Sequence, residues 1–83
     1  MYTVYVLRDE SGKLYKGMTN NLPRRIREHK SGKTITTSRM KNLKVVYEEV
    51  YDIFEKARER ELYLKSAAGR RFLKKSLIVS RQS

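Results

Sequence analysis

The order of apolar and polar positions predicts that the chain begins with a β-hairpin. Residues 2–7 are rich in β-branched and aromatic side chains, and a second such run, residues 13–17, follows the turn-forming residues 9–12. Side chains alternate between the two faces of a strand. If the strands pair symmetrically about a single loop residue, Tyr5 and Tyr15 therefore project from the same face.

A short amphipathic helix is expected after the hairpin. The segment 20–23 offers an asparagine cap and a proline in the first turn, and residues 31–32, Ser-Gly, are typical of a helix end. Leu22 and Ile26 mark the apolar stripe of this helix. Adjacent to the stripe, one turn apart, lie Arg25 and His29.

The second half of the chain predicts one more strand and two more helices. Residues 33–42 are polar and expected to be irregular, residues 43–51 read as a third strand, and a helix begins after Asp52. A last helix is expected over residues 70–79, separated from the previous one by Gly69. The inward positions expected in this last helix are Phe72, Leu73, Leu77 and Ile78. The result is one α+β domain over residues 1–83, a small three-stranded antiparallel sheet flanked by helices, in the order β-β-α-β-α-α.

Glu61 breaks the apolar pattern of the second helix. The periodic positions of that helix are Phe54, Ala57, Glu61 and Leu64. A carboxylate turned toward the core costs on the order of several kcal/mol unless it is paired or holds a cation. Two interpretations follow, a buried salt bridge, for example to Arg25, and a metal ligand.

Charge is abundant and unevenly distributed. The 83 residues carry 20 Lys and Arg against 9 Asp and Glu, a net charge of +11, which indicates a polyanionic partner. Six of the nine acids fall within residues 48–61, where they would oppose a phosphate backbone. Solvated pairs of Glu55 and Glu59 with basic neighbours on one helix face are the simplest account of these acids.

The residues that are absent exclude several kinds of site. Without cysteine and with one histidine, the chain has no disulfide, no thiolate zinc site and no all-histidine metal site, so any metal must be bound by oxygen. No nucleophile elbow supports acyl transfer and no Gly-rich loop supports nucleotide binding, so no organic cofactor is expected. The apolar runs are too short to span a membrane, and we expect a cytoplasmic protein.

What remains suits phosphodiester hydrolysis. That reaction needs a cation for the developing negative charge, a cationic side chain on the phosphate and a proton acceptor for the attacking water. Two tyrosines on one hairpin, an arginine and histidine on the next helix, and an inward glutamate form such a set.

In the order of its motifs, the chain resembles a stand-alone GIY-YIG nuclease domain, and more remotely the N-terminal domain of the excinuclease C subunit. Thr3-Val4-Tyr5 stands at the first motif of that family and Tyr15-Lys16-Gly17 at the second. Thr3 replaces the glycine of the first motif and Lys16 the isoleucine of the second, while both tyrosines and Gly17 match. The resemblance covers about residues 2–79 and continues through residues 18–25, 28–29, 31–33, 58–66 and 69–75.

The resemblance implies a metal-dependent endonuclease and a role for each site residue. Glu61 would hold one Mg²⁺ or Mn²⁺, and Tyr5 would be the general base, its pKa of about 10 lowered by the cation and nearby arginines. Tyr15 would orient the water or the phosphate. Arg25 would stabilise the pentacovalent state, and His29 would assist as a hydrogen-bond donor or secondary proton carrier.

DNA is the expected partner, with RNA as the alternative, and we expect a monomer that acts in repair, in recombination or on mobile elements. Thr36, Thr37 and Arg39, in the polar loop, are further candidates for backbone contacts. Two other function classes stay open, a nucleic-acid-binding module that does not cut and a small basic RNA- or ribosome-associated protein. The residues expected to bind nucleic acid are Lys16, Arg24, Arg27, Lys33, Arg39 and Arg70.

Overall fold

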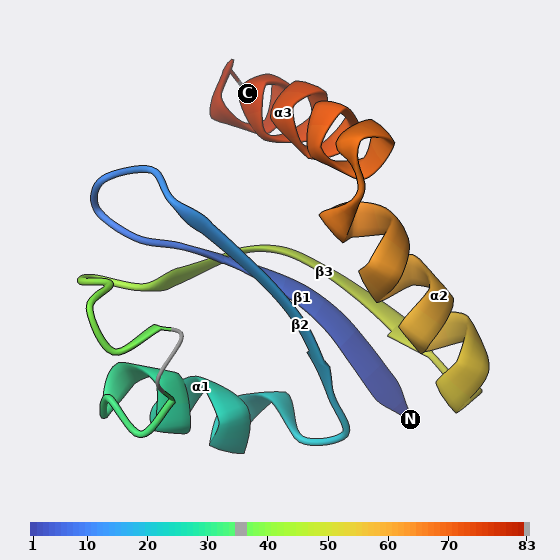
Figure 1. The fold of residues 1–83 in the computed structure, drawn as a ribbon, viewed down its shortest axis with the longest axis horizontal. Coiled ribbons are helices and arrows are strands. Elements are labelled where there is room, and N and C mark those ends of the chain that lie inside the picture. The colour runs from blue at the N-terminus through green and yellow to red at the C-terminus, as the bar shows by residue number, and fades with distance from the viewer. Residues whose placement is uncertain (35–36, 83) are drawn as a thin grey trace.

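The computed structural model describes residues 1–34 and 37–82, and the side chains of the last helix up to residue 77. Three antiparallel strands form one sheet, with helices against both faces (Figure 1). The strands are β1 (Tyr2–Arg8), β2 (Leu14–Thr19) and β3 (Lys44–Tyr51), in the sheet order β2-β1-β3. The helices are α1 (Leu22–Lys30), α2 (Phe54–Lys65) and α3 (Ala67–Gln82). The predicted α+β class and element order are confirmed.

The hairpin register places the two motif tyrosines on one face, as expected. Leu7 pairs with Tyr15 and Tyr5 pairs with Gly17, so the pairing is symmetric about Ser11. The buried Asp9 carboxylate fixes this turn, because its Oδ1 accepts hydrogen bonds from the backbone N–H groups of Ser11 and Lys13, at 3.0 and 2.8 Å.

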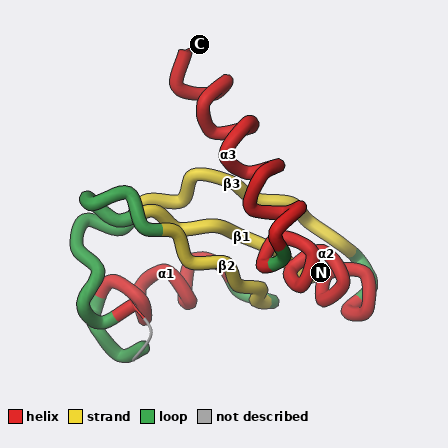
Figure 2. The backbone as a smooth tube through the Cα atoms, turned by 45° about the horizontal axis from the view of Figure 1, so that its top comes forward, coloured by secondary structure: helices red, strands yellow, loops and turns green. Residues whose placement is uncertain are grey.

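The sheet divides the apolar core into two layers. On one face, Tyr5, Leu7 and Leu43 pack with the half-buried Leu22 and Ile26 of α1. On the other face, Val4 and Val6 of β1 pack with α2 and α3 through Ala57, Leu64 and Leu73, all fully buried. Figure 2 shows α1 beneath the sheet and α3 extending away from it on the other side. The sheet therefore separates the tyrosine face from the face that carries α2 and α3.

Local signals set both ends of α1. The side chain of Asn21 accepts a hydrogen bond from the backbone N–H of Arg24 at 3.1 Å, and Pro23 lies in the first turn. The helix ends at Ser31, followed by Gly32 with φ of +78°, a conformation that glycine adopts without strain. The apolar stripe of Leu22 and Ile26 then turns Arg25 and His29 toward the sheet.

The second helix pair departs from the sequence prediction. The break lies at Ser66, whose backbone is extended, and α3 begins at Ala67 rather than at residue 70. Gly69 is not a separator but a residue of the first turn of α3, where a Cβ would lie 1.9 Å from the carbonyl oxygen of Tyr63. The backbones of α2 and α3 meet there, so a residue with no side chain is required.

The inward positions predicted for the helices are only partly buried. Leu73 and Ala57 are fully buried, whereas Phe72 and Leu77 are half-buried. Phe54 is 44% exposed and packs edge-on against the ring of Tyr2, while Ile78 lies outside the described side chains. In the described part of the chain, no helix is both long enough and apolar enough to cross a lipid bilayer.

Substituting Gly69→Ala is expected to destabilise the fold by at least about 3 kcal/mol, lowering the melting temperature by more than about 10 °C. The added methyl group would overlap the Tyr63 carbonyl and force α3 away from α2. Ala68→Gly, at the exposed neighbouring position, should cost only about 1 kcal/mol through helix propensity. Thermal unfolding followed by circular dichroism measures both, and equal losses would contradict the close approach at Gly69.

Candidate functional site

The candidate site lies against the edge strand β2, where Tyr5 of the central strand crosses over Gly17. A Cβ at Gly17 would lie 2.7 Å from the Tyr5 hydroxyl oxygen and 3.0 Å from Cε1 of Tyr15. The missing side chain leaves room for both rings, whose centroids are 6.2 Å apart. Gly17 therefore allows the two motif tyrosines to share this surface.

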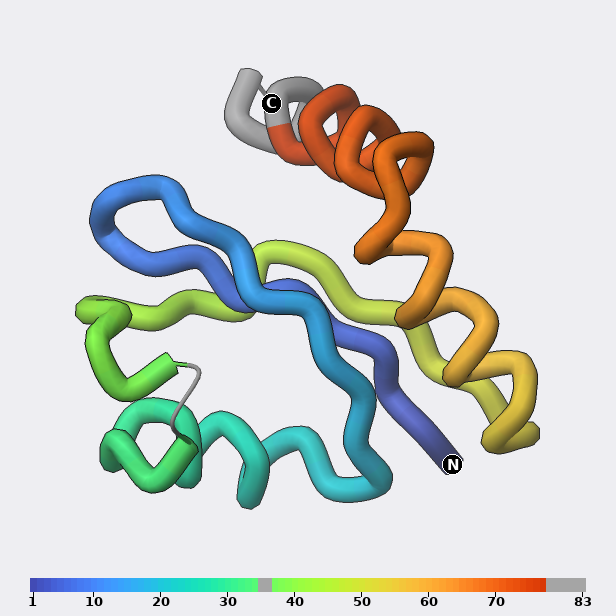
Figure 3. Tube along the Cα trace, viewed as in Figure 1, coloured from blue at the N-terminus to red at the C-terminus, as the bar shows by residue number. Residues whose placement is uncertain are grey.

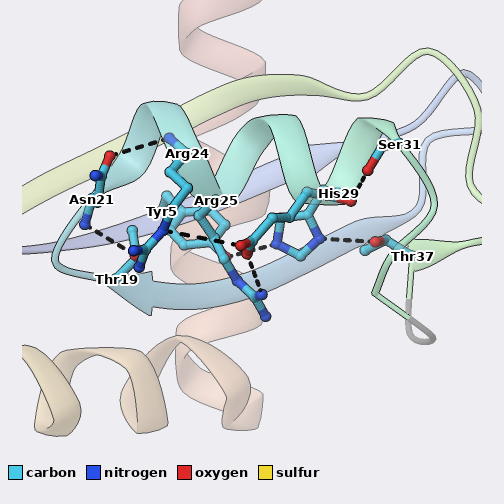
Figure 4. A network of polar contacts seen from close by, with 9 residues as sticks. Tyr5, Thr19, Asn21, Arg24, Arg25, His29, Ser31 and Thr37 are labelled. Carbon is cyan, nitrogen blue, oxygen red and sulfur yellow. Dashed lines mark hydrogen bonds and ion pairs between the residues drawn. The ribbon is translucent and has the colours of Figure 1, made fainter.

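A buried chain of polar groups joins Tyr5 to the loop after α1. The Tyr5 hydroxyl and His29 Nε2 share a hydrogen bond of 2.8 Å, and His29 Nδ1 shares another of 2.8 Å with Thr37 Oγ1 (Figure 4). Tyr5 is fully buried, His29 is 2% exposed and Thr37 is 1% exposed. The ring of Tyr15 packs edge-on against His29, with centroids 4.8 Å apart. All three buried polar side chains thus have a hydrogen-bond partner.

Burial of Tyr5 changes its acidity in the direction opposite to the sequence expectation. Loss of solvation is the largest effect and raises the pKa of Tyr5 to about 12. A hydrogen bond from Arg25 lowers this pKa, as expected, but does not outweigh burial, and the charge of Glu61 raises it further. Arg25 therefore acts on the pKa of Tyr5 in the expected direction, and burial outweighs it.

His29 is neutral in this environment. Burial lowers its pKa most, the positive charge of Arg25 lowers it further, and the negative charge of Glu28 opposes both. A neutral imidazole has one donor and one acceptor nitrogen. His29 can therefore accept a proton on one side of the ring while donating a hydrogen bond on the other.

Arg25 holds its charge close to the phenol. Its Nη1 donates to Glu28 Oε1 at 2.9 Å, and its side chain is 33% exposed. Hydrogen bonds to Glu28 and then to Tyr5 raise the pKa of Arg25, while Arg25 in turn lowers the pKa of Glu28. The partner of Arg25 is thus Glu28, and the salt bridge to Glu61 that the sequence allowed is not formed. Figure 4 shows Arg25 and His29 extending from the same helix toward the sheet.

Glu61 lies mostly buried on α2 and acts electrostatically on the same phenol. Its side chain is 18% exposed, and its Oε2 is 3.7 Å from Nζ of Lys65. Among residues 1–34 and 37–82 no three His, Cys, Asp or Glu residues gather as a ready metal cage. One carboxylate fits Mg²⁺ nevertheless, because this ion keeps several waters and takes substrate phosphate oxygens as ligands.

The expected nucleic-acid-binding residues lie on two sides of β2. Lys16 points to the face of α2 and α3, where it is half-buried, and loss of solvation together with the charges of Arg70 and Lys65 lowers its pKa. Arg70 itself is exposed on the first turns of α3. The remaining four are exposed on α1 or in the loop that follows it: Arg24, Arg27, Lys33 and Arg39.

Sequence reasoning misplaced Thr37. We expected it to contact a nucleic-acid backbone, but it is buried against His29, and Thr36 lies outside the described residues. Its backbone N–H donates to the carbonyl of Thr34 at 3.2 Å, and its own carbonyl accepts from Met40 at 3.0 Å. A short turn thus brings Thr37 under α1. No local pattern reveals this, because the contact depends on how the loop folds back.

A second polar cluster, on the opposite face of the sheet, was also unforeseen. The Glu49 carboxylate accepts hydrogen bonds from the hydroxyls of Tyr47 and Tyr51 and from Arg60 Nε, the last at 2.9 Å. The guanidinium of Arg60 lies 4.9 Å from the ring centroids of both Tyr63 and Phe72. The spacing of Tyr47, Glu49 and Tyr51 at alternate positions of one strand is the signal that could have indicated it. This cluster ties α2 to β3 and is separate from the tyrosine face.

Comparison with known proteins adds independent information. Residues 1–75 match the family described as the GIY-YIG catalytic domain. The UPF0213 protein CPE1444 of Clostridium perfringens (strain 13 / Type A) is 38% identical over 66 residues, covering 78% of this chain and 71% of the relative. The UPF0213 protein in the VLF1-GP41 intergenic region of Autographa californica nuclear polyhedrosis virus is 37% identical over 75 residues, covering 87% and 71%.

A solved structure has the same fold. The solution NMR structure of the UPF0213 protein BH0048 from Bacillus halodurans superposes with a TM-score of 0.55 at 32% sequence identity, over 96% of this chain and 84% of that chain. The family match contains both motif tyrosines, the α1 residues of the site and Glu61. With this match over most of its length, and with relatives above 30% identity along most of theirs, the chain belongs to the GIY-YIG family of nuclease domains.

Proposed function

We propose that this protein is a divalent-metal-dependent endonuclease that hydrolyses phosphodiester bonds in DNA, with a role in repair, recombination or mobile-element processing. The observation that carries the proposal is that the β-hairpin and α1 bring one phenol, one imidazole and one guanidinium together, while the carboxylate of Glu61 on α2 acts on the same phenol through its charge. Tyr5 responds electrostatically to both Arg25 and Glu61. This set meets the requirements of phosphodiester hydrolysis.

Arg25 binds the phosphate. Its guanidinium is a donor-only group, one third exposed, that already contacts a carboxylate. A phosphate oxygen is an equivalent acceptor, so a substrate can take the place of Glu28 without moving Arg25 away from Tyr5. The planar guanidinium then faces the extra negative charge that develops on the phosphorus oxygens in the transition state.

Tyr5 and His29 remove the proton from the attacking water together. With a pKa of about 12, only about one Tyr5 in 10⁵ is a phenolate at pH 7, so a free phenolate is a scarce base. His29 Nε2, at 2.8 Å, can take the phenolic proton while the Tyr5 oxygen receives the proton of the water. The proton then resides on His29, whose neutral form is favoured beforehand.

Glu61 would hold the metal ion. When bound, Mg²⁺ or Mn²⁺ neutralises charge on the phosphate and on the leaving oxygen. Glu61 contributes the carboxylate ligand, and Lys65 beside it partly offsets its charge in the absence of the ion. The basic residues on both sides of β2 supply the sequence-independent attraction for the nucleic-acid backbone.

The first prediction concerns the carboxylate. Glu61→Gln is expected to reduce Mg²⁺-dependent nicking of supercoiled DNA by at least about 100-fold, because the variant keeps the side-chain shape and loses the ligand charge. Glu55→Gln removes the same charge from an exposed position on the same helix and should leave the rate unchanged. Conversion of plasmid to nicked circles over time measures both.

Two further arms of the same assay test the alternatives. Arg25→Lys, which keeps the charge and loses the planar fork, should also lower the rate strongly. EDTA should abolish cleavage of every substrate in a panel of duplex, flap, Holliday-junction, single-stranded DNA and RNA. Tight DNA binding with no cleavage under any divalent ion would support the non-cutting module, and cleavage of RNA alone would overturn the assignment to DNA.

The second prediction is a pH profile that separates the two possible bases. If neutral His29 accepts the proton, the nicking rate rises with pH up to the pKa of His29, which lies below 6.5, and is then level between about pH 7 and 10. If free Tyr5 phenolate were the base, the rate would rise about tenfold per pH unit across that interval, because the pKa of Tyr5 is about 12. A continuous rise from pH 7 to 10 would contradict the paired mechanism.

A further inference from the structure

Thr37 is the last group of the buried polar chain, and its position is set by its own backbone. Hydrogen bonds of its N–H to Thr34 and of its carbonyl to Met40 hold it in a short turn. This turn presents Oγ1 to His29 Nδ1 at 2.8 Å, at a residue that is 1% exposed. Among the described residues, Thr37 Oγ1 is the hydrogen-bond partner of the Nδ1 side of the imidazole.

The partners on both sides of the ring determine which nitrogen carries the proton. Arg25 has donors only, and its positive charge acts on the phenol of Tyr5, which favours a Tyr5 oxygen that turns its lone pairs toward the guanidinium. The hydroxyl proton of Tyr5 is then free to point at His29 Nε2. A neutral imidazole that accepts at Nε2 must carry its proton on Nδ1 and needs an acceptor there, and Thr37 Oγ1 is placed to be that acceptor.

We infer that Thr37 is a positioning residue that holds His29 in the Nδ1–H tautomer, with the unprotonated Nε2 facing the hydroxyl of Tyr5. The charged groups closest to the imidazole, Arg25 and Glu28, both lie on α1 and do not contact Nδ1 in the described structure. The acceptor role of Nε2 therefore depends on Thr37.

The inference deepens the proposed nuclease function and rests on it for its catalytic meaning. During hydrolysis the attacking water gives a proton to the Tyr5 oxygen, and the phenolic proton passes to Nε2, leaving an imidazolium whose Nδ1–H still bonds Thr37. The new bond forms between the water oxygen and phosphorus, the bond to the leaving oxygen breaks, and solvent protonates that oxygen. In the opposite tautomer Nε2 would already carry a proton and could accept none.

The experiment reads the tautomer directly. His29 is the only histidine of the chain, so ¹⁵N-histidine labelling gives two ring-nitrogen resonances, and the long-range couplings of each nitrogen to the Hδ2 and Hε1 protons assign them to Nδ1 and Nε2. At pH 8 the free protein should show Nδ1 protonated and Nε2 unprotonated. Thr37→Val, which keeps the shape and loses the hydroxyl, should shift the population toward Nε2–H, and Thr37→Ser should restore the native tautomer.

Activity supplies the second readout. Thr37→Val is expected to lower the nicking rate by about 10- to 100-fold, as loss of a group that orients a functional histidine does, and Thr37→Ser to recover most of it. Ser31→Ala removes a hydroxyl from the end of α1, where it donates to the Glu28 carbonyl, and should change neither readout. Thermal unfolding of each variant checks that the fold is retained.

The outcomes distinguish this inference from the proposed function. A wild-type protein that carries its proton on Nε2, or a folded Thr37→Val variant with the native tautomer and rate, overturns the role of Thr37. If Thr37→Val does not fold, the wild-type and Thr37→Ser spectra still decide the tautomer. If the wild-type protein cleaves no substrate, the proposed function fails while the tautomer measurement remains decisive for Thr37.

Discussion

The buried phenol of Tyr5 is the group on which the arrangement of the site depends. A hydroxyl that loses water must find a protein partner or cost on the order of 1–3 kcal/mol, and Tyr5 lies in the central strand, fully buried. Three neighbours from two elements, β2 and α1, answer this requirement. Gly17 leaves the space, His29 bonds the hydroxyl, and Arg25 adds a charge beside it. Because His29 is itself buried, it needs Thr37 in turn, so one phenol organises the hairpin, α1 and the following loop.

The same burial determines how readily Tyr5 can lose its proton. Removing water from Tyr5 makes its phenolate costly, and the nearby Glu61 makes it costlier, while Arg25 opposes both. Under the proposed function, a cation at Glu61 and a phosphate at Arg25 would balance these opposing charges. A neutral His29 beside the phenol removes the need for a free phenolate. Burial makes a lone tyrosine a poor base, but it is compatible with a tyrosine and a histidine that act as a pair.

Local signals made much of this fold predictable, and long-range packing accounts for what was missed. Alternation and the turn at residues 9–12 were enough to place Tyr5 and Tyr15 on one face, and the Asn21 cap with Pro23 was enough to start α1. Gly69 was read as a break because its contact with the Tyr63 carbonyl is invisible in the sequence. The raised pKa of Tyr5 and the burial of Thr37 depend on which elements cover them. The family resemblance therefore suggested a lowered pKa for Tyr5, and the polar loop suggested an exposed threonine.

The measurement that tests this account most directly is the titration of Tyr5 followed by ¹³C NMR of the tyrosine ring carbons. The chain has six tyrosines, and a hydrogen bond to Glu49 together with burial also raises the pKa of Tyr51 to about 12, so the Tyr5→Phe variant is needed to identify the Tyr5 signal. In the folded, metal-free protein, Tyr5 should stay protonated at pH 10, in keeping with a pKa of about 12, and Arg25→Ala should raise that pKa further. A Tyr5 signal already half-titrated at or below pH 10 would contradict the claim that burial governs the site.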